Sequence, residues 1–328
     1  MVGDAVLSPE LRAMMTAGRP SVALVGCFDR ASDTEAFIYR ALERSGVTCL
    51  MLREEFYSQA EAAGKLEGFD VVIFVKGRFR DSAFPKRPPL EFIERCRDQG
   101  SVVCCWLFDL LTKEWSADRY AWAVKTSTFC NVFFTTDGYF ARHCDDLSNV
   151  EVLRQGIPDD WREGKVLPRY KSDFLFLGVP YRERIEFVKT MTQLYGTRFQ
   201  MGYDCPRGAA VCDACESAKL IVDCAWPRFD YYWSDRVYVV AGAGGCFLAP
   251  PIPGMAEEGW IPGKNFLAYD ADVPLEQQVD RFEFYAADED WRGKIRTEAA
   301  RFSREHHTYD CRIRQLLTVL DSKGLLNK

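Results

Sequence analysis

The residues best suited to chemistry in this sequence lie at the start of a helix predicted in the carboxyl-terminal half. Asp235 and Arg236 precede a run of apolar and small residues that ends at Gly244 and Gly245, a pattern typical of a helix, a tight turn and then a strand. The first N–H groups of a helix lack partners within it and its dipole makes that end positive, so an anion would bind there. Asp235 is a suitable N-cap, and the planar guanidinium of Arg236 suits a diphosphate. An ordinary capped helix with a surface arginine is the alternative.

Carboxylates that follow apolar runs in the amino-terminal half are the candidates for acid–base chemistry. Asp29 and Asp109 both stand in such places, and ligands of parallel sheets bind beyond the carboxyl ends of the strands. A buried carboxylate there can take a proton from an acceptor hydroxyl group. We therefore select Asp109 as the preferred catalytic residue and Asp29 as a weaker candidate. The alternative for Asp109 is a structural ion pair with Lys113 or Arg119.

A basic cluster runs from Lys76 to Arg87 and has phenylalanines between its cations. Such a loop can contact phosphates and stack on a base. We therefore assign Lys76, Arg78 and Arg80, with His143 as a further candidate, to the acceptor side, the part of the protein that would bind the molecule whose hydroxyl group reacts. The net charge of −6 argues against general coating of nucleic acid, because non-specific affinity comes from Lys and Arg on phosphates. A solvated loop is the alternative.

The order of motifs between residues 234 and 312 resembles that of GT-B glycosyltransferases, in particular the group-1-like set that includes CgeB-type proteins. The segments that carry the resemblance are Asp235–Tyr238, Gly244–Leu248, Glu257–Trp260, Pro262–Asn265, Tyr269–Asp270 and His307–Tyr309 with Arg312. The run that ends at Asp109 also resembles a family segment of the form YWxxD. One departure is Val239, which stands where many relatives have a glutamate on the donor ribose.

The resemblance implies an α/β fold of GT-B type, with two doubly wound Rossmann-like domains facing across a cleft. It implies a nucleotide-sugar donor, of which a UDP-sugar is the first choice, in the carboxyl-terminal domain, and no other cofactor. The residues expected to bind the donor are Gly178, Arg182, Arg184, Lys219, Asp235, Arg236, Gly244, Gly245 and Glu257.

We accordingly expect a metal-independent hexosyltransferase whose acceptor is a glycan, a small molecule, a protein or DNA. Two alternatives stay open: an enzyme that modifies hydroxymethylated bases in DNA, and a non-catalytic nucleotide-sugar-binding module that has lost the donor acids.

Cys212 and Cys215 have the spacing of zinc ligands, but Cys205 and Cys224 do not form a second such pair, so we expect no metal.

Alternating apolar runs and helical patterns predict a doubly wound parallel sheet in the amino-terminal half. Its strands are expected at residues 21–28, 47–52, 69–75, 101–108, 131–135 and 150–153. We expect an acceptor-side domain over residues 1–165, a nucleotide-sugar domain over 166–305, and a last helix, 306–328, that packs back towards the first domain.

The cysteine content and the first residues of the sequence bear on its location. Thirteen cysteines without a basic and apolar leader predict a reducing compartment, so we expect a cytoplasmic protein. The uncharged run from Val237 to Met255 is interrupted by glycine and proline, so we expect no membrane span.

Overall fold

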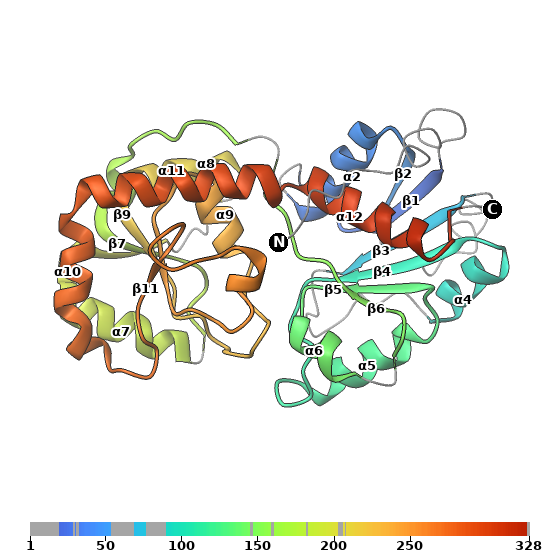
Figure 1. Cartoon of the computed structure of the whole chain (residues 1–328), viewed down its shortest axis with the longest axis horizontal. Helices are drawn as coiled ribbons and strands as arrows, with labels where there is room; N and C mark the ends of the chain where they lie inside the picture. The colour runs from blue at the N-terminus through green and yellow to red at the C-terminus, as the bar shows by residue number, and fades with distance from the viewer. Residues whose placement is uncertain are drawn as a thin grey trace. The chain divides into compact units, whose positions relative to one another are not determined.

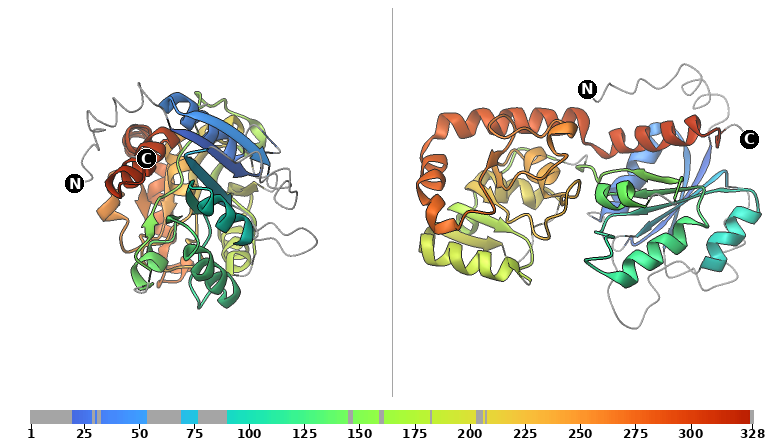
Figure 2. Two further views of the ribbon diagram at one scale, coloured as in Figure 1. Left: turned by 90° about the vertical axis from the view of Figure 1, so that its right-hand side faces the viewer. Right: turned by 60° about the horizontal axis from the view of Figure 1, so that its bottom comes forward.

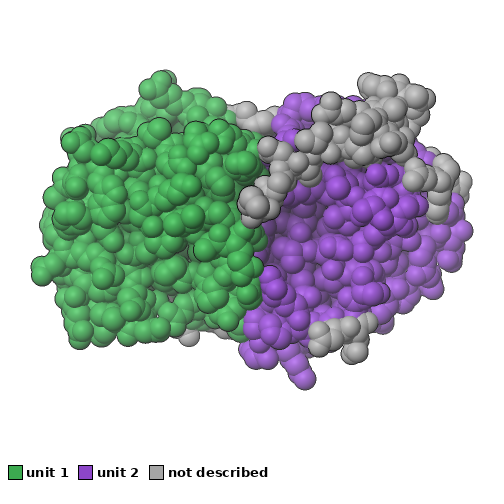
Figure 3. All heavy atoms as spheres, in the orientation of Figure 1, with its two compact units in different colours: residues 1, 156–308 green, residues 2–155, 309–328 purple. Residues whose placement is uncertain are grey.

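The computed structural model describes residues 20–28, 30, 33–53, 69–76, 90–144, 147–158, 161–181, 183–202, 206 and 208–326. The chain divides into two compact units, which Figure 3 colours separately. Unit 1 comprises residues 156–308 together with residue 1, and unit 2 comprises residues 2–155 and 309–328. The structural division therefore falls between Gln155 and Gly156, ahead of the expected boundary at 165/166, and the chain returns to unit 2 at Tyr309.

Unit 2 contains a six-stranded parallel sheet with the order β2-β1-β3-β4-β5-β6 (Figure 1). Its elements are β1 (Ser21–Gly26), α2 (Thr34–Ser45), β2 (Thr48–Arg53), β3 (Val71–Lys76), α4 (Leu90–Asp98), β4 (Val102–Leu107), α5 (Ala117–Ser127), β5 (Val132–Thr135), α6 (Gly138–His143), β6 (Val150–Val152) and α12 (Tyr309–Ser322).

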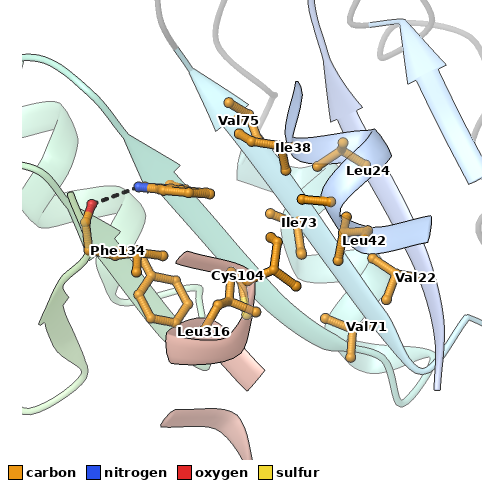
Figure 4. Packing of buried hydrophobic residues seen from close by; sticks show 14 of the residues in the cluster. Val22, Leu24, Ile38, Leu42, Val71, Ile73, Val75, Cys104, Phe134 and Leu316 are labelled. Atoms are coloured by element: carbon orange, nitrogen blue, oxygen red, sulfur yellow. Dashed lines mark hydrogen bonds between the residues drawn. The ribbon is translucent and has the colours of Figure 1, made fainter. Parts of the chain in front are cut away.

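Helices cover both faces of this sheet because its central strands are apolar on both sides. Alternate residues of β1, β3 and β4 pack against α2 and α12 on one face and against α4, α5 and α6 on the other. Figure 4 shows Leu316 of α12 beside Cys104 and Phe134 of the sheet. The buried Trp106 ring donates its Nε1–H to the Leu153 carbonyl oxygen at 2.9 Å. The last helix is therefore part of the core of unit 2.

Unit 1 contains a five-stranded parallel sheet with the order β11-β10-β9-β7-β8. Its elements are η2 (Pro168–Tyr170), β7 (Ser172–Leu177), α7 (Glu183–Tyr195), η3 (Gly196–Arg198), β8 (Phe199–Gly202), α8 (Ala209–Ser217), β9 (Ala218–Val222), α9 (Arg236–Gly242), β10 (Phe247–Ala249), η4 (Ala256–Glu258), β11 (Leu267–Ala268), η5 (Leu275–Gln278), α10 (Val279–Ala287) and α11 (Glu289–His306).

The sheet of unit 1 is also covered on both faces. Helices α8 and α9 pack on one face, and α7 and α10 pack on the other (Figure 2). Helix α11 contributes Ala299 to the first face and Ile295 to the second. The turn between α9 and β10 depends on two glycines: Gly244 adopts a left-handed conformation with φ of 76°, and a Cβ on Gly245 would lie 2.7 Å from Val240. The predicted doubly wound α/β architecture is confirmed in both units, and no helix in the described ranges is long and apolar enough to cross a membrane.

Candidate functional site

The strand order of unit 1 marks one place where a ligand is expected. The chain runs from β7 to β8 on one side and then returns to β9, β10 and β11 on the other, so β7 and β9 flank the switch point. Ligands of such sheets bind beyond the carboxyl ends of the strands at this point. The residues that directly follow β7 and β9 are Gly178 and Asp223.

A pocket of about 50 Å³ lies at this switch point. Its polar lining comes from Arg184, Asp223, Ser234 and Arg236, and its apolar walls come from Tyr181, Ala225, Trp226, Pro227, Tyr232, Trp233, Val237, Phe247, Ala249, Pro250, Ile252 and Met255. A volume of this size holds a few water molecules or a group of the size of a phosphate. All of these residues belong to unit 1.

Arg236, the first residue of α9, brings a largely shielded positive charge to the pocket. Its Nη1 lies 2.9 Å from Oδ1 of Asp223, and the two side chains are only 14% and 5% exposed. Its Nε donates to the Ser234 hydroxyl oxygen at 3.2 Å, and its guanidinium lies over the ring of Phe176. Although burial lowers the pKa of Arg236, the negative charge of Asp223 raises this pKa overall. The guanidinium is therefore held charged at the switch point.

Arg184, in the first turn of α7, supplies a second guanidinium, and one of its donors has no acceptor. The residue is 8% exposed, its Nη2 donates to the Trp226 carbonyl oxygen at 2.9 Å, and its guanidinium lies 4.4 Å from the centre of the Tyr181 ring. Its buried Nε has no hydrogen-bond partner. Burial and the nearby charge of Arg236 lower its pKa. A buried cation with an unused donor beside a second cation is a site for an anion.

Gly178 allows this arrangement because it has no side chain. A Cβ at this position would lie 3.1 Å from Nη1 of Arg236 and 3.4 Å from the ring of Phe176. A larger residue would push the guanidinium away from the end of β7. The structure thus brings together three of the predicted donor-binding residues, Gly178, Arg184 and Arg236.

Asp235 adjoins this group, but the prediction that it caps the helix is wrong. Its backbone is already helical, with φ of −58° and ψ of −15°, and its side chain accepts no capping hydrogen bond. Burial raises its pKa, and the charge of Arg236 opposes that effect. Helix α9 has only seven residues, so the positive charge of the pocket comes from the arginines and not from the helix end.

Glu257 lies in η4 and accepts a hydrogen bond from Tyr231 at 3.1 Å.

The structure places three predicted donor-binding residues at the other end of the sheet. Lys219 is the second residue of β9 and forms an ion pair with Asp173 at 2.7 Å, near the beginning of β7. Gly244 and Gly245 precede β10 and shape the turn into that strand. Because the strands are parallel, residues at their beginnings are a full strand length from the pocket. The arrangement gives these three residues structural roles.

The candidates in unit 2 are placed as follows. Asp109 follows β4, and its Oδ2 lies 3.9 Å from Nη1 of Arg119, which is one of the two ion pairs named as the alternative to catalysis. His143 ends α6 and stacks on Tyr139, with Nδ1 2.8 Å from the Tyr139 carbonyl oxygen. A catalytic role for Asp109 and an acceptor role for His143 stay predictions.

Several predicted positions lie outside the described residues, namely Asp29, Arg78, Arg80, Arg182 and Cys205, and of Lys76 only the backbone is described. In the ranges that are described, no three His, Cys, Asp or Glu side chains gather in a way that would hold a metal ion. Cys212 and Cys215 are free thiols buried in α8.

Asp223 was not among the predicted site residues, although the sequence contains a signal for it. Asp223 directly follows the apolar run of β9, the same position after a strand that drew attention to Asp109. Tyr181 was also missed as a pocket residue, since aromatic side chains in loops are as common in cores as in sites.

The carboxyl-terminal part of the chain matches a known protein family. Residues 175–318 match the family model described as Glycosyl transferase-like. This segment contains the whole of the pocket. No curated protein matches the chain in sequence.

Solved structures resemble the chain over almost its whole length. HepE of Anabaena in complex with UDP-glucose has a TM-score of 0.60 and 9% identity, covering 92% of this chain and 99% of that one. A glycosyltransferase of Rickettsia africae has a TM-score of 0.61 and 10% identity, covering 94% and 99%. An alpha-glucosyltransferase in complex with UDP and a 13-mer DNA containing an HMU base has a TM-score of 0.60 and 9% identity, covering 95% and 100%. The predicted GT-B fold is confirmed.

Proposed function

We propose that this chain, whose residues 175–318 match a glycosyl transferase-like family, moves a sugar from a nucleotide-sugar donor to an acceptor hydroxyl group. The observation that carries the proposal is the pair of guanidiniums of Arg184, which is buried, and Arg236, which is 14% exposed, at the switch point of unit 1, the first with an unused Nε–H donor. The Anabaena relative, HepE, was solved with UDP-glucose, which supports a donor of this class.

The pair suits the charge that develops in such a reaction. As the bond between sugar and diphosphate breaks, the leaving diphosphate gains negative charge. Fixed donors aimed at developing charge in a site shielded from water stabilise it strongly. Arg184 and Arg236 would supply this stabilisation without a metal ion, so we extend the proposal to metal-independent transfer of a hexose from a UDP-sugar. Asp109 is our candidate for the acceptor's base.

A panel of nucleotide sugars tests donor binding. A ligand that binds only the folded protein raises its melting temperature by mass action. UDP-, GDP- and dTDP-sugars should be compared on the wild type, on Arg184→Met and on Lys219→Met, which removes a cation at the other end of the sheet. We expect a UDP-sugar to stabilise the wild type and Lys219→Met, and to have little effect on Arg184→Met. Equal responses of the two variants, or no response of the wild type, would refute the proposal.

Turnover separates an enzyme from a binding module. Slow hydrolysis of the bound nucleotide sugar, measured as release of the free nucleotide, is expected of a transferase without its acceptor. If the donor binds without any hydrolysis or transfer, and Val239→Glu creates activity, the chain is a binding module that has lost a donor acid.

DNA is the acceptor favoured by one specific observation. Several of the similar structures are of an alpha-glucosyltransferase bound to DNA, one of them with an HMU base. A labelled duplex that carries hydroxymethylated bases should be shifted by the protein in a salt-sensitive manner, because phosphate contacts release counterions. No shift at low salt would leave glycans, small molecules and proteins as acceptors.

The cysteine content leads us to place the protein in a reducing compartment such as the cytoplasm.

A further inference from the structure

Asp223 is the only carboxylate among the described residues that line the pocket. Its backbone is fixed at the end of β9, because its N–H donates to the Leu248 carbonyl oxygen at 2.9 Å and its own carbonyl oxygen accepts from the Tyr269 hydroxyl at 2.9 Å. Its side chain is 5% exposed and faces Arg236 at 2.9 Å. A fixed negative charge thus stands inside a site whose other charged groups attract anions.

The charges of the lining explain what this carboxylate does when no ligand is bound. Arg184 is buried and the side chain of Arg236 is only 14% exposed, and a cation withdrawn from water without a counter-charge is strongly unfavourable. Asp223 offsets one of the two positive charges and holds the Arg236 guanidinium in place. A phosphate group that binds the same guanidinium meets the negative charge of Asp223 at close range, and like charges in a water-poor site repel.

We propose that Asp223 is an internal counter-anion of the pocket, which holds Arg236 in the absence of ligand and competes with phosphate groups for it. The competition grows with the charge of the ligand. If the proposed function is correct, the free nucleoside diphosphate carries one more negative charge than the nucleotide sugar, so Asp223 weakens the binding of the product more than that of the donor. Asp223 is on this view a positioning residue that also promotes product release.

Inorganic pyrophosphate is a suitable probe because it depends on neither the base nor the sugar. Its affinity should be measured by calorimetry for the wild type and for Asp223→Asn, which keeps the shape of the side chain but removes its charge. Asp173→Asn is the matched control, since Asp173 is also a partly buried strand carboxylate of unit 1 in an ion pair, with Lys219 at 2.7 Å, but lies at the other end of the sheet.

We expect Asp223→Asn to bind pyrophosphate about tenfold more tightly than the wild type, a difference of about 1.4 kcal/mol, and Asp173→Asn to bind as the wild type does. The ratio of UDP affinity to UDP-glucose affinity should also rise in Asp223→Asn. A purely structural role for Asp223 would not increase affinity. Equal or weaker binding of pyrophosphate by a folded Asp223→Asn protein would overturn the proposal.

A second measurement covers the case in which Asp223→Asn does not fold. In a crystal of the wild type with pyrophosphate in the pocket, Nη1 of Arg236 should have moved from Oδ1 of Asp223 towards the ligand. A retained contact of 2.9 Å beside bound pyrophosphate would refute the competition. Pyrophosphate binding without any nucleotide-sugar binding would refute the proposed function and leave this inference standing, whereas the reverse pattern would do the opposite.

Discussion

Replacing either pocket arginine by methionine should weaken anion binding, but the two changes should affect stability very differently. Methionine keeps most of the length of the side chain and removes its charge. The Arg236→Met change leaves the Asp223 carboxylate, 5% exposed, without the cation that lies 2.9 Å from it. At that distance the attraction is about 6 kcal/mol with an effective dielectric constant of about 20. Most of it offsets desolvation, and stranding one partner of such a pair lowers the free energy of unfolding by about 3–5 kcal/mol.

The Arg184→Met change has opposing effects that nearly cancel. It loses the hydrogen bond from Nη2 to the Trp226 carbonyl oxygen, which contributes about 1.5–3 kcal/mol as a bond from a charged donor. It also removes a buried Nε without a partner, whose burial costs about 1–3 kcal/mol, and it removes repulsion with Arg236. We therefore expect the free energy of unfolding to stay within about 1 kcal/mol of the wild type.

Urea unfolding without ligand and titration with pyrophosphate measure the two effects separately. Each variant should bind pyrophosphate about 10- to 150-fold more weakly, which corresponds to one lost charge-assisted contact of about 1.5–3 kcal/mol. The stabilities of the two variants should differ by about 2–6 kcal/mol. The reasoning fails if Arg184→Met unfolds as easily as Arg236→Met, or if either variant binds pyrophosphate as the wild type does.

Three further predictions concern the supports of the fold. Asp137→Ala should lower the free energy of unfolding by about 2–4 kcal/mol, measured in urea, because two buried backbone N–H groups lose their acceptor at 2.8 and 2.9 Å. Burial raises the pKa of Asp137 in the folded protein. The stability advantage of the wild type over Asp137→Asn should therefore be present in full below about pH 4 and should shrink as the pH rises through the folded pKa. A difference in the free energy of unfolding that stays constant with pH would contradict this. Gly245→Ala should destabilise by about 1–3 kcal/mol, since its Cβ would lie 2.7 Å from Val240, whereas Gly293→Ala, inside α11 with open space around it, should stabilise by up to about 1 kcal/mol.

The order of the elements could be predicted from the sequence because it depends on local patterns of apolar residues and glycines. Apolar runs of four to eight residues between helical segments predicted the six strands of unit 2. The Gly244-Gly245 pair predicted the turn after α9, since a left-handed backbone favours glycine. The motif order between residues 234 and 312 indicated the GT-B fold.

The composition of the pocket could be predicted only in part. The structure brings together Arg184, Arg236 and Gly178, and their donor-binding role stays a prediction, whereas Lys219, Gly244 and Gly245 were predicted with them although they lie at the beginnings of strands. A sequence shows that a residue is near a strand, and the site depends on which end of the strand it occupies in the folded sheet.

The sequence by itself determined the alternation of strands and helices, the glycine turn and the presence of arginines near two strand ends, because each of these depends on neighbouring residues. Only the tertiary structure decided that Asp223, at the end of β9, meets Arg236, and that Arg184 of α7 joins them with an unused donor. These residues come from three segments, 39 and 13 positions apart in the sequence, and they meet because β7 and β9 are neighbours in the sheet. Burial then strengthens the electrostatic interactions between these charges, and a local sequence pattern does not show how deeply a residue is buried.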